Sequence, residues 1–78
     1  MAKQYNGHKS WAYWNVSLWL FNDEGLYNMV RSEVRSSRTK DVAAQRIVQE
    51  LNDCGLTQTP DGARYSVSAV RAAIAGEV

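Results

Sequence analysis

Histidine and cysteine, the residue types most used for nucleophilic catalysis and zinc binding, occur once each in this sequence, as His8 and Cys54. They lie far apart in the chain and lack the companions that a nucleophile–base pair or a tetrahedral zinc site requires. The adjacent carboxylates Asp23 and Glu24 would point about 100° apart on a helix, and the positive end of the helix dipole already accounts for both. No glycine-rich phosphate loop is present. We therefore predict a protein that is not an enzyme, with no catalytic residue, metal or cofactor.

The remaining chemistry is that of charge. Between Arg31 and Arg46 the chain carries five basic and two acidic residues, a local net charge of +3 in a protein whose formal net charge is +1. If a helix continues through Ser36 and Ser37, the first three arginines of this window share one side of it. Guanidinium groups bind carboxylates and phosphates through paired hydrogen bonds, although a basic face that contacts only solvent is the alternative. The predicted partner-binding residues are Arg31, Arg35, Arg38 and Arg46.

Length and composition limit the architecture that can position these arginines. The 78 residues make one domain, residues 1–78, and 45% hydrophobic with 22% charged residues is typical of a globular chain. The single cysteine permits no intrachain disulfide, so packing, helix caps or a partner chain must stabilise the thin core. The balanced charge excludes a strongly basic protein of the histone-like or membrane-surface kind. No long apolar run lies near the N-terminus, so a signal peptide is not expected. The most apolar segment, residues 11–21, is too short to span a membrane, which needs about 20 residues.

Four helices are predicted, roughly over residues 11–21, 23–36, 40–54 and 67–75. Each follows a residue whose side chain can accept a hydrogen bond from the free amides of a first helical turn, namely Ser10, Asn22, Thr39 and Ser66. Gly55 stands where a left-handed residue would close the third helix. The run Thr59-Pro60-Asp61-Gly62 has the signature of a type I turn. The predicted fold is therefore a single all-α domain of four short helices.

The first predicted helix has apolar side chains around its whole circumference. Trp11, Trp14, Leu18 and Phe21 form the tighter stripe, which we expect to face the core of the same chain. The alternative is that three neighbouring helices surround this one. In the third predicted helix, an apolar stripe ends at Cys54 and predicts a small buried thiol. The apolar residues left for a second copy of the chain or a partner are Tyr13, Val16, Trp19 and Leu20.

Residues 5–28 contain a specific pattern. An Asn-Gly pair precedes an aromatic helix with the sequence Trp-Asn-Val-x-Leu-Trp at residues 14–19, and Asn-Asp-Glu-Gly-x-Tyr-Asn follows at residues 22–28. This pattern resembles a family of small phage and prophage proteins, and it returns weakly at residues 59–62. The chain departs from it at His8, where an aromatic residue is common, and at Ala12, where an acidic residue is common.

The resemblance implies a phage accessory protein that acts in the cytoplasm of a bacterial host. Small phage proteins of this kind include anti-CRISPR proteins, many of which occupy the nucleic-acid-binding surface of a CRISPR effector complex. We therefore expect a non-enzymatic inhibitor that binds a CRISPR surveillance complex of type I and blocks target DNA binding. A homodimer is a further expectation from the apolar first helix. The alternative is a small phage nucleic-acid-binding regulator that uses the basic stripe on phosphates, which a net charge of +1 disfavours.

Overall fold

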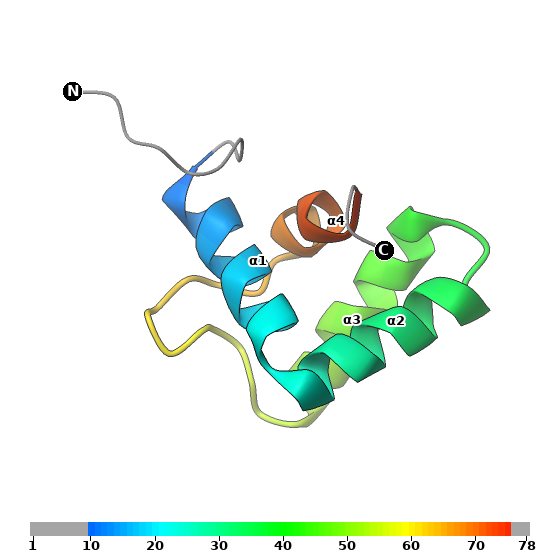
Figure 1. Ribbon diagram of the computed structural model, residues 1–78, viewed down its shortest axis with the longest axis horizontal. Coiled ribbons are helices and arrows are strands. Elements are labelled where there is room, and N and C mark those ends of the chain that lie inside the picture. Colours follow the sequence, from blue (N-terminus) through cyan, green and yellow to red (C-terminus); the bar gives the residue numbers. More distant parts are fainter. Residues whose placement is uncertain (1–9, 76–78) are drawn as a thin grey trace.

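The chain folds into four helices, as a computed structural model shows for residues 10–75 (Figure 1). Within this range there is no strand, and an isolated bridge pairs Gln58 with Arg64. The predicted all-α fold is confirmed, and the predicted ranges agree with the observed ones to within one residue at each end. His8 lies outside the described residues. The helices are α1 (Trp11–Asn22), α2 (Glu24–Ser36), α3 (Lys40–Asp53) and α4 (Val67–Ala75).

Local side chains determine where the helices begin. At each start, a side-chain oxygen accepts a hydrogen bond of 3.0–3.3 Å from the amide three residues further on. The four capping residues are Ser10, Asp23, Thr39 and Ser66. Asn22, predicted to cap the second helix, is instead the last residue of α1. Because Asp23 alone separates α1 from α2, the two helices form a tight corner.

The end of α3 is closed as the sequence predicts. Gly55 has a φ of +81°, and the Leu56 amide donates to the Leu51 carbonyl at 2.8 Å, which is a Schellman arrangement. The prediction of a buried thiol at Cys54 is wrong, because this residue is the C-cap of α3 and its side chain is exposed. The helix ends at Asp53, one residue before Cys54, so the thiol does not share the direction of the buried stripe within α3.

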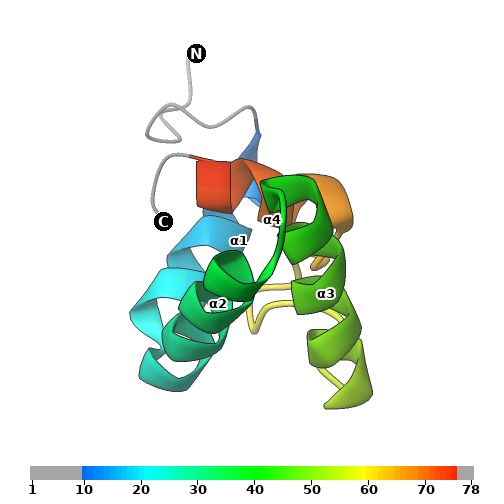
Figure 2. The same ribbon diagram turned by 90° about the vertical axis from the view of Figure 1, so that its right-hand side faces the viewer.

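The core forms where α1 and α3 meet α4 and where α2 meets both α1 and α3 (Figure 2). Val16 and Leu20 of α1 are 0% exposed, so the prediction that these two residues meet a partner is wrong. Trp11, predicted to be in the core, is 41% exposed. The physical reason is size, since alanines on α3 and α4 bring the helices close together and valine and leucine fit between them better than tryptophan. These buried alanines are Ala43, Ala44, Ala69 and Ala73.

The remaining apolar residues of α1 are partly buried. Tyr13 and Phe21 pack against the core, and Trp19 remains partly exposed to solvent. The alternative prediction, in which other helices surround α1, describes the structure better, although only α2 and α4 are helical neighbours. The third neighbour is the segment that leads from α3 to α4, which passes beside α1 (Figure 1). None of the helices in residues 10–75 is long and apolar enough to cross a bilayer.

Candidate functional site

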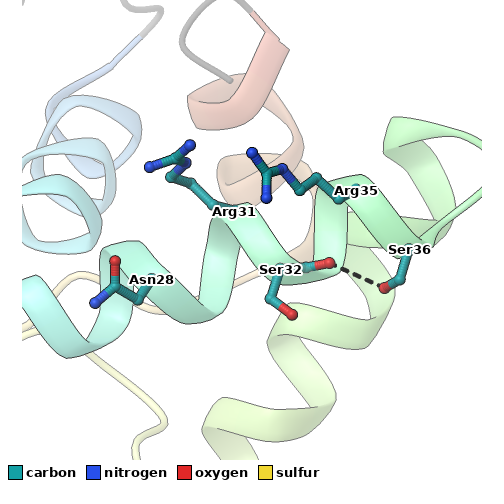
Figure 3. A pocket seen from close by; sticks show the side chains of 5 residues that line it. All are labelled: Asn28, Arg31, Ser32, Arg35 and Ser36. Atoms are coloured by element: carbon teal, nitrogen blue, oxygen red, sulfur yellow. Dashed lines mark hydrogen bonds between the residues drawn. The ribbon is translucent and has the colours of Figure 1, made fainter.

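Two of the four predicted arginines lie side by side on α2. Arg31 and Arg35 are one helical turn apart, and both side chains extend from the same side of the helix (Figure 3). Together with Asn28, Ser32 and Ser36 they line an open hollow of about 440 Å³, here termed the arginine cradle. The cradle thus places two positive charges beside amide and hydroxyl groups. This set of donors suits a carboxylate or a phosphate.

Aromatic packing supports the first of these arginines. The Arg31 guanidinium lies 5.7 Å from the centre of the Tyr27 ring, within the range of a cation–π interaction. The Tyr27 ring meets Phe21 of α1 edge to face, with 5.6 Å between centres. Contacts of this kind limit the rotamers of Arg31 while they leave its outward-facing hydrogens available. The Ser36 hydroxyl, by contrast, donates to the Ser32 carbonyl at 2.9 Å and is turned toward its own helix (Figure 3).

The other two predicted arginines are not part of the cradle. The condition under which Arg38 would share a helix face with Arg31 and Arg35, a helix that continues through Ser37, is not met, because Ser37 is extended, with φ −103° and ψ 148°. Arg38 therefore lies in the turn before α3, away from the helix face that carries Arg31 and Arg35. Arg46 projects from α3, where it lies 3.9 Å from the Glu33 carboxylate, and it donates to the Ser37 hydroxyl at 3.4 Å. The structure thus brings together Arg31 and Arg35 only.

Further charges of the basic window hold α3 against α4. The Lys40 ammonium donates to the Ala75 carbonyl at 3.0 Å, at the C-terminus of α4, where a positive charge is favourable. Asp41 accepts a hydrogen bond of 2.7 Å from Arg71. Within residues 10–75, neither Arg31 nor Arg35 takes part in an ion pair. The local excess of positive charge is therefore available at the cradle.

Two carboxyl groups meet between α2 and α3 on another side of the molecule. A hydrogen bond to Glu33, partial burial and the negative charges of Glu33 and Asp53 raise the pKa of Glu50 above its ordinary value. Since the folded-state pKa is raised, this group contributes stability that is complete below its unfolded pKa and is lost as pH rises through the folded pKa. Ionisation of Glu50 at neutral pH therefore destabilises the contact of α2 with α3.

Glu50→Gln is expected to raise the melting temperature at about pH 7 and to leave it unchanged at about pH 3.5, below the ordinary glutamate pKa. Glutamine stays neutral and still offers a hydrogen bond to Glu33, so the contact persists. The gain should be a few tenths of a kcal/mol, since interactions between exposed charges rarely exceed about 1 kcal/mol. Thermal unfolding at both pH values measures it. Glu24→Gln is the matched control and should show the opposite sign, because Glu24 lies in the first turn of α2.

The Trp-Asn-Val-x-Leu-Trp pattern of α1 has a structural role. Asn15 is 1% exposed, and its Nδ2 donates to Asp61 Oδ2 at 2.9 Å. Trp19 Nε1 donates to the same oxygen at 3.0 Å. The Thr59 hydroxyl donates to Asn15 Oδ1 and accepts from the Ala63 amide at 3.0 Å. Residues of the pattern thereby attach the predicted turn at residues 59–62 to α1.

These hydrogen bonds also affect an acidic group. Donation from Asn15 and then from Trp19 lowers the pKa of Asp61 below its ordinary value. The turn itself forms as predicted, with the Gly62 amide donating to the Thr59 carbonyl at 2.9 Å. Among the described residues no buried side-chain polar atom is left without a partner. The polar network is thus complete and explains why polar residues stand in an apolar helix.

Sequence reasoning missed the uncharged part of the cradle. Asn28, Ser32 and Ser36 repeat every four residues. The two arginines have the same spacing, and each directly precedes one of the two serines. Residues at this spacing share a helix face, so the pattern could have been found beside the arginines. Within residues 10–75, no group of three or more histidine, cysteine, aspartate or glutamate side chains could hold a metal ion.

The fold and the cradle define a class: a small all-α domain that carries paired arginines on an exposed helix. The chain belongs to DUF7249, a family of unknown function, which matches residues 1–77. No curated protein and no solved structure matches the chain at a significant level. The family thus covers the cradle, the polar network and all four helices.

Proposed function

We propose that this protein is a non-enzymatic binding protein that holds an anionic group of a macromolecular partner in the arginine cradle. The observation that carries the proposal is the pairing of Arg31 and Arg35 beside Asn28 and Ser32, with no ion pair to either arginine within residues 10–75. Charge-assisted hydrogen bonds from two guanidiniums are about twice as strong as neutral ones. The hollow is open, which suits a group presented on a surface better than an enclosed small molecule.

The partner that we propose is a bacterial CRISPR surveillance complex of type I. This choice is supported by the resemblance of residues 5–28 to small phage proteins and by the size of the chain. By pairing with acidic or phosphate groups of that complex, the protein would exclude target DNA and act as an inhibitor in the host cytoplasm. The cradle would then supply orientation and association rate through complementary charge.

Charge reversal in the cradle tests this function. The double variant Arg31→Glu/Arg35→Glu is expected to weaken binding to a purified type I surveillance complex by at least about a hundredfold, since loss of a charged pair costs about 2–5 kcal/mol. The measurements are biolayer interferometry with the complex and retention of target DNA by the complex in a gel. Circular dichroism should be unchanged, because both side chains are exposed.

The matched control changes the net charge equally outside the cradle. Arg38→Glu/Arg64→Glu alters two exposed arginines that do not line the cradle, and it should bind and inhibit like the natural protein. Equal losses in both double variants would indicate a general effect of charge and would contradict a specific cradle. Undiminished inhibition by the Arg31 and Arg35 double variant would do the same.

A second candidate function is the binding of nucleic acid through the same cradle, since guanidinium pairs also suit phosphate. Two phosphate contacts would give a slope of log K against log salt of only about −1.8, so the binding would be weak at physiological salt. An electrophoretic shift with free duplex DNA at about 0.1 M salt separates the two functions. A shift that Arg31→Glu/Arg35→Glu abolishes would favour the regulator over the inhibitor.

A further inference from the structure

A second hollow lies at the opposite end of α2 from Ser36 and has a different character. It is formed where the end of α1 and the start of α2 meet the segment between α3 and α4, and its volume is about 500 Å³. We refer to it as the aromatic hollow. The residues that line it are Trp19, Asp23, Gly25, Leu26, Leu56, Gln58, Pro60 and Tyr65.

Most of the wall of the aromatic hollow is apolar and held in place. The Asp61 carboxylate fixes the Trp19 ring through the 3.0 Å hydrogen bond to its indole nitrogen. The Schellman turn after α3 places Leu56, which is 41% exposed although it is a large aliphatic residue. Pro60 and Leu26 complete this wall. A preformed concave surface of this size and composition is typical of a ligand site.

Two oxygen-bearing side chains give the hollow a polar end. Asp23 Oδ1 accepts from the Leu26 amide at 3.0 Å, which leaves its second oxygen available. Tyr65 is only 4% exposed as a whole residue, but its hydroxyl oxygen is not among the buried polar atoms and makes no side-chain hydrogen bond within residues 10–75. Burial and the negative charge of Asp23 raise the pKa of Tyr65, so the phenol stays protonated at neutral pH and lies within the field of the carboxylate. The hollow therefore offers a negative charge and a hydroxyl that makes no side-chain hydrogen bond to the described part of the chain.

After the apolar wall and the polar end, the third feature of the aromatic hollow is Gly25. Glycine in the first turns of a helix costs up to about 1 kcal/mol relative to alanine. Here a Cβ atom would lie 3.3 Å from Asp23 Oδ1, closer than ordinary van der Waals contact. The absence of a side chain thus keeps space beside the carboxylate in a hollow that Gly25 itself lines.

We propose that the aromatic hollow binds an apolar cation, that is, an ammonium group carried on an alkyl or arylalkyl body. The ammonium would pair with Asp23 and donate to the Tyr65 hydroxyl oxygen. The apolar body would lie against Trp19, Leu26, and Leu56, where a tryptophan face also attracts cations. This site is independent of the arginine cradle, which selects the opposite charge.

The test uses probes that share a phenylethyl body and differ in the charge of the group at its end. Phenethylammonium is titrated into the protein labelled with ¹⁵N, and 2-phenylethanol and hydrocinnamate serve as neutral and anionic counterparts. We expect the Trp19 indole resonance to shift and that of Trp11 to stay in place. The neutral probe should bind about three- to fivefold more weakly, as the loss of one exposed charge pair implies. Equal affinity for all three probes, or no shift at Trp19, overturns the proposal.

The natural source of the ammonium group can be a free amine or a lysine of a partner protein. A second titration therefore compares acetyl-Leu-Lys-Leu-amide with the same peptide carrying norleucine in place of lysine. Binding of the lysine peptide well above phenethylammonium indicates a protein partner, and the reverse order indicates a small amine. If neither phenethylammonium nor the lysine peptide binds, the proposed site does not exist.

Two variants keep the test independent of folding. Asp23→Asn retains a residue that caps helices as well as aspartate does but removes the charge, so binding should fall about three- to fivefold with the fold intact. Leu56→Ala removes an exposed wall and should also weaken binding. Asp53→Asn is the matched control, because it makes the same chemical change at an exposed carboxylate outside the hollow. If Asp23→Asn binds phenethylammonium like the control, the proposed charge pair does not exist.

Discussion

Replacing Leu20 with alanine is expected to lower the free energy of unfolding by about 3 kcal/mol, the usual result for a fully buried leucine whose cavity does not collapse. Leu20 is 0% exposed and belongs to the core cluster that joins α1 to the other helices. A domain of this length has a total stability of roughly 4–12 kcal/mol, so the loss is a large fraction of it. Urea unfolding followed by circular dichroism at 222 nm measures the change.

A matched substitution separates a core role from a role at an interface. Trp11→Ala removes a larger side chain from the same helix, but this residue is 41% exposed and should cost far less stability. If Leu20 contacted a second copy of the chain, its replacement would change the mass measured by light scattering and leave the unfolding of the monomer nearly unchanged. A smaller loss for Leu20→Ala than for Trp11→Ala would contradict the burial described above.

The comparison of these two residues shows what the sequence could predict. Helix starts and the end of α3 depend on local chemistry at Ser10, Thr39, Ser66 and Gly55, and each was predictable from the residue itself. Which face of α1 turns toward the core was not predictable, because a helix with apolar side chains all round has no polar face that must point to solvent. The packing of the other helices determined this face, because their small buried alanines leave space that Val16 and Leu20 fill.

The arginine cradle was predictable in the part that depends on local spacing. The spacing of Arg31 and Arg35 is local and ensures one helix face. The place of Arg38 depended on one backbone conformation at Ser37, which the sequence does not determine strongly. The aromatic hollow was beyond prediction, because it joins Trp19 to residues more than forty positions away, such as Tyr65.

The two hollows also have a common structural basis in α2. Its N-cap Asp23 and its first turn, through Gly25, contribute to a negatively charged hollow, and its last two turns contribute two arginines to a positively charged one. A short helix with such separated charges can orient a partner that carries the complementary arrangement. The polar network around Asn15 is important to the aromatic hollow, because it positions the segment that supplies Pro60 and Tyr65.

Asn15→Ala is accordingly expected to lower the free energy of unfolding by about 2–3 kcal/mol, since it leaves the buried Thr59 hydroxyl without its acceptor and creates a small cavity. The melting temperature should fall by roughly 10–20 °C, because 1 kcal/mol corresponds to about 4–8 °C in a domain of this size. Asp61 loses its first donor, so its pKa should rise toward the ordinary value. Thermal unfolding and a ¹³C-detected titration of the carboxyl groups measure the two effects.

A double-mutant cycle with Thr59→Val decides whether the network acts as a unit. Valine keeps the shape of threonine but removes the hydroxyl, so the double variant leaves no orphaned hydroxyl facing α1. The Ala63 amide loses its acceptor equally in the Thr59→Val single variant and in the double variant, so this loss cancels in the cycle. The two losses should therefore be less than additive by about 1 kcal/mol, within the range for residues in direct contact. Additive losses would mean that Asn15 stabilises α1 by packing alone. In that case the turn, and with it the wall formed by Pro60, would be held by Trp19 and the backbone.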